Sequence, residues 1–434
     1  MQAYYTTLFI SLDIGKNVHW CAAYAGYDLK EVVKPCKVRS NQAGFEQVSR
    51  LIDGLLESGQ YERVVIGHEP TGLYHENWAC ALYERYVTGR DPDLYPQVAY
   101  QFVNPLLSKR KRLELTKGRQ RKTDPIDLRA IGYCLRDGQG QPAFVAEAQN
   151  FAFQLWGRAY RRNRRHNRDL TTKLLAQLDR LWPGLVVNTQ RFAAMHPDLE
   201  PPVPLVLSKP LERQRLRAII QHCPNPYDFR ALDQAHIQAF FRQHLGRCGQ
   251  ATAQLAFDLI QQALLPPPDL ASLLADQLHL DFERYLQLER HFESLVEQAL
   301  LLVPYSPAAV LTTVPGVSPV LAARYLAHLG HPQRFASAAQ IWAFAGFDLV
   351  TEQSGDFRRL GHISRKGDPG LRDTLFLIGL HTAHQLPAIA RAKQRALKRG
   401  KGFVAATIHA AHKANRLLHH LLYHQRPFDP DRLR

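Results

Sequence analysis

The sequence predicts an α/β domain at the N-terminus followed by mainly α-helical regions. Up to about residue 140, short β-branched and aromatic runs alternate with segments of helical periodicity, as in a mixed sheet covered by helices. Two long amphipathic stretches follow, at 150–182 and 270–303. The chain has 434 residues. At roughly 100–200 residues per domain, two to three domains are expected.

The N-terminal elements can be assigned in chain order. They are two strands around a turn within residues 7–24, a helix at 46–58, a strand at 61–70 ending at Glu69, a helix from His75 and a strand at 97–105. Thr123 can then cap a helix that begins with Asp124 and carries Pro125 in its first turn. Asp124 and Asp127 are three residues apart and therefore share one face of this helix.

The remaining chain is predicted to be helical. The leucines of 150–182 fit a helix that pairs with 270–303 as an antiparallel hairpin or forms a coiled coil with another chain, and simple packing within the chain is an equal alternative. Short helical patterns between proline-rich segments at 184–270 indicate an inserted helical region. From about 308, a P-G-x-x turn before a helix resembles a helix-hairpin-helix element, in which backbone N–H groups near Gly316 would hold a phosphate.

The composition favours a protein that binds nucleic acid. The formal net charge is +16 and the pI is near 9.7, and such a surface attracts nucleic acid or anionic lipid. A hydrophobic content of 45% is enough for packed cores. The six cysteines form no C-x-x-C pair, which argues against a structural zinc site or a disulfide framework. Because no signal peptide and no apolar run of membrane-spanning length is recognised, a cytoplasmic location without membrane contact is expected.

Four carboxylates stand out beside the most basic stretch of the chain. They are Asp13, Glu69, Asp124 and Asp127. Any one of them alone would more often be a helix cap, a surface charge or an arginine partner. Carboxylates from several elements are, however, the ligands that Mg²⁺ prefers, and two such ions about 3.5–4 Å apart stabilise the attacking and leaving oxygens of a phosphodiester. The set therefore predicts phosphodiester chemistry on nucleic acid.

Clusters of basic residues are the expected contacts to that nucleic acid, with a solvated loop or surface solubility as the alternative. The first cluster comprises Lys109, Arg110, Lys111, Arg112, Lys117, Arg119, Arg121 and Lys122. The second comprises Arg161, Arg162, Arg164 and Arg165, and the third comprises Arg358, Arg359, Arg365, Lys366 and Arg372. Arginine engages phosphate through two parallel hydrogen bonds, which suits such a role.

The motifs resemble a known family. ISLDIGK, VIGHEPTGLY, VNP and RKTDPIDLRAI are similar, in this order, to the N-terminal motifs of the DEDD transposases of insertion sequence family 110, which include Piv-type DNA invertases and bridge-RNA-guided recombinases. TVPGVSPVLAARYLAHLG, FASAAQIWAFAGF and QSG…GHISRKGDPGLR look like the C-terminal transposase domain of that family. The resemblance covers roughly 7–140 and 308–385, and one departure is Gly316-Val317-Ser318 in place of G-x-G.

The resemblance implies an α/β ribonuclease-H-like (resolvase-like) N-terminal domain plus mainly α-helical coiled-coil and C-terminal transposase domains. We expect them at 1–145, 146–305 (with the insertion at 184–270) and 306–434. It further implies that the four acids hold Mg²⁺ and that Ser354 forms a covalent link to DNA, with Ser364 as the competing serine. The implied partners are donor and target DNA, a noncoding guide RNA, and further copies of the chain in a dimer that assembles to a tetramer.

Three other functions remain open at the level of the sequence. A metal-dependent DNA nuclease or junction resolvase would use the acids without a covalent intermediate. An actin-like ATPase or sugar kinase would explain LDIGK, but a second phosphate loop is not recognised. A non-enzymatic nucleic-acid-binding protein would use the acids only structurally. The motifs do not separate transposition from site-specific inversion.

Overall fold

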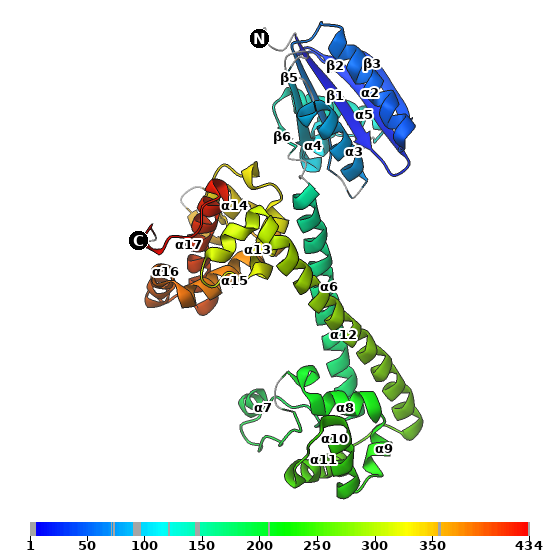
Figure 1. Cartoon of the computed structure of the whole chain (residues 1–434), viewed down its shortest axis with the longest axis vertical. Coiled ribbons are helices and arrows are strands. Elements are labelled where there is room, and N and C mark those ends of the chain that lie inside the picture. Colours follow the sequence, from blue (N-terminus) through cyan, green and yellow to red (C-terminus); the bar gives the residue numbers. More distant parts are fainter. Residues whose placement is uncertain are drawn as a thin grey trace. The chain divides into compact units, whose positions relative to one another are not determined.

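The computed structural model describes residues 6–70, 72, 74–89, 97–119, 122–143, 148–206, 209–354, 357–432 (Figure 1). It divides into two compact units. The first comprises Met1–Phe151 with Leu329–Gln340, and the second comprises Ala152–His328 with Ile341–Arg434. This division differs from the three expected domains, whose boundaries stay a prediction.

The first unit contains a six-stranded mixed sheet in the order β3-β2-β1-β4-β5-β6. The strands are β1 (Thr7–Ile14), β2 (Val18–Ala25), β3 (Lys30–Arg39), β4 (Arg63–His68), β5 (Gln97–Val103) and β6 (Gly140–Pro142). β4 lies parallel to β1 and β5, and the other pairs are antiparallel. The predicted mixed α/β fold is therefore confirmed, whereas β3 and β6 were not predicted.

Helices cover both faces of this sheet because side chains along each strand alternate between the faces. Leu8, Ile10 and Leu12 of β1 pack with α2 (Gln42–Glu57) and α3 (His75–Tyr83), which continues into the π-helical turn η1 (Glu84–Thr88). Phe9, on the opposite face, packs with Leu128 and Ile131 of α5 (Asp124–Arg136). Asp13 has the same parity as Phe9, so its side chain lies on the α5 face.

A helix occupies the basic stretch after β5, where the sequence predicted no element. This helix, α4, spans Pro105–Leu115. The side chain of Asn104 accepts a hydrogen bond from the backbone N–H of Leu106, and Pro105 opens the helix. Both residues are typical of a helix start.

The long helices of the second unit, α6 (Ala148–Leu181) and α12 (Pro268–Leu302), pair as an antiparallel hairpin within the chain (Figure 1). The Trp156 indole N–H donates to the Leu295 carbonyl at 2.7 Å, and the Asn163 amide donates to the Leu288 carbonyl at 3.0 Å. Further along, the Lys173 ammonium pairs with the buried Asp281 carboxylate at 2.7 Å. Of the predicted alternatives, pairing within one chain is the one observed.

The insertion folds as a small helical module with its own core. Its helices are α7 (Thr189–Met195), α8 (Gln214–His222), α9 (Pro226–Arg230), α10 (Gln234–Leu245) and α11 (Gln250–Gln262), with the short turn η2 (Pro210–Glu212) before α8. Phe229 and Phe241 are buried there against Leu178 of α6 and Phe282 of α12. The predicted helical insertion is thus observed, and it packs against the C-terminal end of α6 and the N-terminal half of α12.

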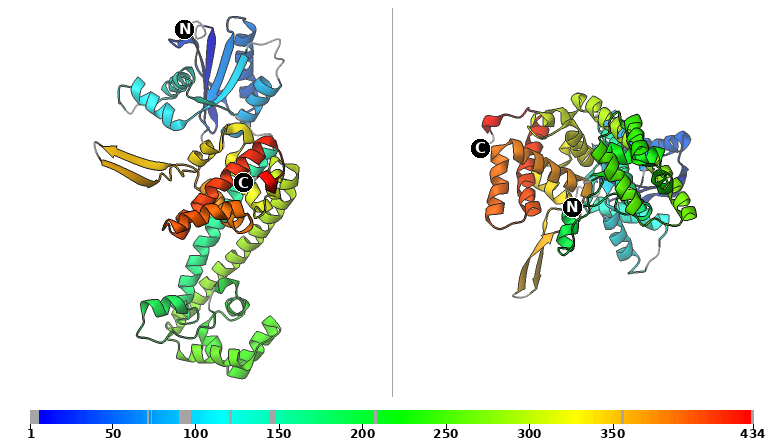
Figure 2. Two further views of the ribbon diagram at one scale, coloured as in Figure 1. Left: turned by 90° about the vertical axis from the view of Figure 1, so that its left-hand side faces the viewer. Right: turned by 90° about the horizontal axis from the view of Figure 1, so that it is seen from below.

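The C-terminal part combines helices with one β-hairpin. Its elements are the 3₁₀ turns η3 (Val303–Tyr305), η4 (Pro307–Thr313), η5 (Pro332–Arg334) and η6 (Pro430–Arg432), the helices α13 (Pro319–Leu329), α14 (Ala338–Phe344), α15 (Pro369–Gln385), α16 (Pro387–Lys398) and α17 (Phe403–His424), and the strands β7 (Leu349–Ser354) and β8 (Phe357–Ile363). The hairpin of β7 and β8 extends away from the helices that flank it in the chain (Figure 2).

In the described ranges, no single helix is long and apolar enough to cross a membrane. The bent pair Pro268–Tyr305 and Pro307–Thr313 meets the length and composition criteria only when its two parts are taken together.

Candidate active site

Asp13 and Glu69 lie next to each other at one edge of the sheet. Asp13 is near the end of β1, and Glu69 directly follows His68, the last residue of β4. Because β1 and β4 are parallel with Leu12 opposite His68, the next residue of each segment, Asp13 or Glu69, lies at a neighbouring position. Glu69 was predicted to lie on a strand, and the structure corrects this because the ladder ends one residue earlier.

Asp124 and Asp127 lie in the first turn of α5, as predicted. The N-terminal end of a helix carries a partial positive charge that favours acids there. Thr123 occupies the N-cap position, but its side chain makes no capping hydrogen bond, which corrects the prediction. Its carbonyl instead accepts from the backbone N–H groups of Ile126 and Asp127, both at 3.0 Å.

The four carboxylates share one electrostatic environment. Burial raises the pKa of Asp13 to about 6, and the negative charges of Asp127, Glu69 and Asp124 act in the same direction, against Lys122. Burial also raises the pKa of Glu69, and Asp127 adds to this shift. Carboxylates whose pKa is raised by burial together with neighbouring acids, as for Asp13 and Glu69, are characteristic of functional sites. The structure therefore brings the four predicted acids together.

Helix α4 supplies direct partners for two of these acids. The Ser108 hydroxyl, whose residue is 2% exposed, donates to a carboxylate oxygen of Glu69. Four residues later, the Arg112 guanidinium donates to the Asp127 carboxylate at 2.6 Å. The sequence did not single out Ser108, although its spacing of four residues from Arg112 places both on one face of a helix. Arg112 was predicted to contact nucleic acid, and here it pairs with an acid.

A divalent cation requires several oxygen donors around one point. Within the described residues, no three His, Cys, Asp or Glu side chains are arranged to hold one ion. The chemistry nevertheless fits a hard cation, because the candidate donors are carboxylate oxygens whose mutual repulsion a cation would relieve. Asp13, Glu69, Asp124 and Asp127 would then hold the ion once Asp127 and Glu69 turn from Arg112 and Ser108. A bound divalent ion would stabilise developing charge on phosphodiester oxygens.

The first basic cluster surrounds these acids only in part. Lys109 and Arg110 are exposed on α4, and Lys111 pairs with Glu114 at 3.0 Å and Asp137 at 3.2 Å. Lys117 and Arg119 follow the helix, and Lys122 is exposed beside Asp124. Arg121 lies outside the described residues. Nucleic-acid contact by this cluster remains a prediction.

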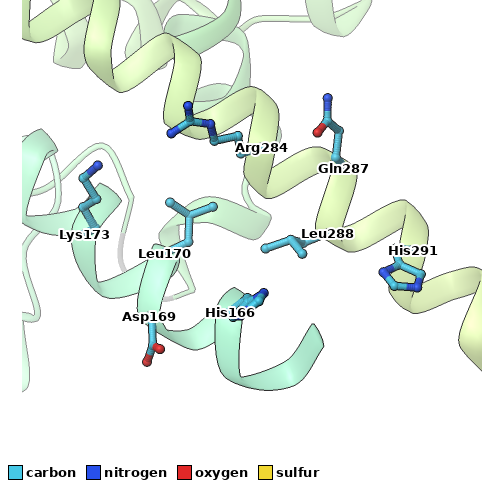
Figure 3. A pocket seen from close by; sticks show the side chains of 8 residues that line it. All are labelled: His166, Asp169, Leu170, Lys173, Arg284, Gln287, Leu288 and His291. Carbon is cyan, nitrogen blue, oxygen red and sulfur yellow. The ribbon is translucent and has the colours of Figure 1, made fainter. Parts of the chain in front are cut away.

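The second basic cluster lies on the exposed surface of α6. Its members are Arg161, Arg162, Arg164 and Arg165. Directly after these arginines in the chain, α6 and α12 line a groove of about 690 Å³. His166, Leu170 and Lys173 of α6 line it together with Arg284, Leu288 and His291 of α12 (Figure 3). Its mixed charges, which include Asp169, do not form a second acid cluster.

The two candidate serines lie at different places around the β-hairpin. Ser354 ends β7 opposite Phe357, but its side chain is not among those described, and Gly355 and Asp356 lie outside the described residues. The backbones of Arg358 and Arg359 belong to β8, and their side chains are likewise outside the description. The Ser364 N–H donates to the Asp348 carbonyl at 2.6 Å, and its hydroxyl oxygen accepts from the Lys366 N–H at 3.3 Å.

Two predicted phosphate contacts have structural roles in the fold. Gly316 has φ of +91°, and a Cβ there would stand 2.9 Å from the backbone of His381 in α15. The Arg372 guanidinium donates to the Ala345 carbonyl at 2.8 Å. Arg365 and Lys366 are exposed. Close packing at Gly316 and the hydrogen bond from Arg372 therefore explain why these residue types occur there, without any ligand.

Two carboxylates at the ends of adjacent parallel strands and two in the first turn of α5, in a chain with a separate helical part, are typical of the class of metal-dependent nucleic-acid enzymes. A DEDD transposase family model matches residues 10–183, and the model described as "Transposase IS116/IS110/IS902 family" matches 308–394. The chain belongs to this IS110 transposase family, and its DEDD domain implies the use of a divalent metal.

One curated relative is "Insertion element IS110 uncharacterized 43.6 kDa protein" of Streptomyces coelicolor. The two sequences are 27% identical over 222 residues, which is 50% of this chain and 52% of that relative. The chain thus matches about half the length of this curated relative.

Proposed function

We propose that the protein is a DNA transposase or recombinase that cuts and rejoins DNA. The observation that carries this proposal is the cluster of four carboxylates next to the basic helix α4, in which burial and neighbouring acids raise the pKa of Asp13 and Glu69, in a chain that belongs to the IS110 transposase family. DNA phosphates would contact the exposed cations of α4, and the carboxylates would hold Mg²⁺ close to the phosphodiester.

The proposed nucleophile is the Ser354 hydroxyl. Its oxygen forms a bond to a DNA phosphorus while the bond from phosphorus to the departing DNA oxygen breaks, and that oxygen takes up a proton. The phosphoserine ester retains the energy of the broken bond, so a hydroxyl of a second strand can reverse the step and restore the serine. Ser354 ends β7, whose partner strand β8 includes Arg358 and Arg359 in its sequence, and this backbone position supports the role.

The partners beyond DNA are proposed on the resemblance. We propose a structured noncoding RNA as the guide for target choice, and a dimer that assembles to a tetramer on two DNA molecules. The +16 net charge is compatible with two nucleic-acid partners.

A covalent trapping assay tests the nucleophile. The full chain, RNA from the sequence flanking its gene, donor and target DNA and Mg²⁺ are mixed and separated on a denaturing gel. We expect a protein–DNA adduct with the unmodified chain and with Ser364→Ala, and its loss in Ser354→Ala and Asp13→Ala. Ser364→Ala is the matched control because it removes a hydroxyl at the other end of the same hairpin.

The same assay distinguishes the alternative function. A metal-dependent nuclease or junction resolvase would cleave DNA without an adduct, and Ser354→Ala would leave that cleavage unchanged. This result, with cleavage still abolished by Asp13→Ala, would contradict the serine mechanism and retain a metal-dependent role for the acids.

A further inference from the structure

The last two long helices, α16 and α17, enclose a cationic pocket that the carboxylate site does not use. Its volume is about 390 Å³. It is lined by Ala392, Arg395, Ala396, Arg399, Lys401, His409, His412, Lys413 and Arg416. Among these lining residues none is acidic. Most of the pocket lies beyond residue 394, where the match to the family model ends.

The sequence around the pocket contains no acid to neutralise it. No aspartate or glutamate occurs between Asp373 and Asp429. The same stretch holds nine cations, namely Arg391, Lys393, Arg395, Lys398, Arg399, Lys401, Lys413, Arg416 and Arg426. Like charges gathered without acids on the same segment oppose folding, so their concentration on two packed helices indicates an anionic ligand.

The cations form two facing rows. On α16, Arg391 and Arg395 are four residues apart and therefore share one face of the helix, and Arg399 follows four residues later at the C-cap. On α17, Lys413 and Arg416 do the same at a spacing of three. Burial lowers the pKa of Lys413, and the charges of Arg391, Arg395 and Arg416 lower it further, which shows that the two rows act on one another.

The length of the rows matches a polyanion better than a single phosphate group. Eight residues of α-helix span about 12 Å. One strand of duplex DNA carries a phosphate about every 3.4 Å along its axis, so about three to four phosphates fit beside the row. The arginines at this spacing remain exposed at the surface, where a nucleic-acid backbone can reach them.

We propose that the pocket between α16 and α17 binds the phosphodiester backbone of a nucleic acid, independently of the carboxylate site. Arg395 and Arg416 contact phosphates from opposite sides, and Arg399 extends the contact along the strand. The binding depends on charge and carries no base readout, because guanidinium groups that meet phosphates read no sequence. This binding does not require DNA cleavage, so the proposal is independent of the proposed reaction.

The test measures binding of the full chain to a fluorescent DNA duplex and to an RNA hairpin over a range of salt concentrations. The variant is the double substitution Arg395→Gln/Arg416→Gln. If it loses two phosphate contacts, the slope of log K against log salt falls by about 1.8 on a duplex. If the affinities of the variant and the unmodified chain are equal at 1 M salt, the variant binds about 60-fold more weakly at 0.1 M salt. If the slope falls only for the DNA duplex, the pocket binds DNA; if it falls only for the RNA hairpin, the pocket binds RNA.

Two further variants make the result specific. Lys398→Gln/Arg426→Gln removes the same charge from exposed positions that do not line the pocket, and it should keep the slope within half a unit. Arg395→Lys/Arg416→Lys keeps the charge and should retain most of the slope. The thermal unfolding midpoint of the glutamine pocket variant should stay equal or rise, because like-charge repulsion is removed.

Unchanged slopes on both nucleic acids in Arg395→Gln/Arg416→Gln would overturn the proposal. Equal losses in the pocket variant and in Lys398→Gln/Arg426→Gln would also overturn it, because net charge alone would then explain the effect. A third contrary result is retained nucleic-acid binding with lost binding to vesicles of anionic lipid, which would assign the pocket to a membrane surface.

Discussion

Asp13 is the residue on which burial and three neighbouring carboxylates act together. Its pKa is raised to about 6, whereas an unperturbed aspartate has a pKa near 3.9. Between these values the folded chain binds more protons at this position than the unfolded chain does. The free energy of unfolding therefore falls as pH rises from about 4 through 6. The metal-free site is destabilised at neutral pH by the charges that a cation would neutralise.

Asp13→Asn tests this destabilisation. In EDTA, we expect the variant to unfold at a temperature about 2–4 °C higher than the unmodified chain at pH 7.5, and at an equal temperature at pH 4, because solvent screens part of the repulsion at a partly buried residue. Calorimetry at the two pH values measures the difference. A variant that is less stable at pH 7.5 would mean that the carboxylate of Asp13 makes a net favourable contact.

Metal binding can be measured without any reaction. If the carboxylates hold Mg²⁺, the ion stabilises the folded chain by about 2.7 kcal/mol at 100 times its dissociation constant. We expect Mg²⁺ to raise the unfolding midpoint of the unmodified chain and of Asp137→Asn, but not that of Asp127→Asn. Asp137 is a suitable control because it pairs with Lys111 and Arg136 and is not part of the acid cluster. An equal response in all three proteins would place the bound ion elsewhere.

At the scale of elements, the sequence predicted the strands with apolar periodicity and missed those without it. β1 and β4 alternate apolar residues that fill both faces of the sheet, so their pattern is strong. β3 is an edge strand with several lysines and Pro35, and these features protect an edge but hide the strand signal. α4 has almost no apolar face, and only its Asn104-Pro105 start reveals it.

The sequence revealed the acids of the candidate site but not their partners on α4. The acids were visible because they sit at the ends of recognisable strands and at a helix start, whereas Ser108 and the pairing of Arg112 with Asp127 depend on where α4 packs. That packing is a contact between segments distant in sequence, which local patterns do not encode.

The turn before α13 permits a test at the same scale, because close packing there explains Gly316 without a ligand. Gly316→Ala would bring a Cβ to 2.9 Å from the α15 backbone in addition to its left-handed strain. We expect it to cost about 1–3 kcal/mol more than Gly246→Ala, whose φ of +74° is similar but which has open space around it. Urea denaturation of both variants gives the difference. Equal costs would remove the packing explanation and favour a functional role for this glycine.

At the scale of the whole molecule, the acids and the candidate serines belong to different compact units of the chain. The acids lie in the unit that contains Met1–Phe151, whereas Ser354 and Ser364 lie in the unit that contains Ile341–Arg434. A chain built in this way can complete a catalytic site either within one protomer or with the serine of one protomer and the acids of another. The proposed assembly on two DNA molecules favours sharing between protomers.

Mixing two inactive variants distinguishes these arrangements. Asp13→Ala retains the serine, and Ser354→Ala retains the acids, so neither alone should form the protein–DNA adduct. If sites are shared between protomers, mixed dimers contain one intact site of two, and mixing equal amounts should restore about a quarter of the unmodified activity, since about half of randomly formed dimers are mixed. Adduct formation in the mixture, carried by the Asp13→Ala chain, is the expected result. If the mixture stays inactive although subunit exchange is demonstrated with differently tagged chains, the site is completed within one protomer.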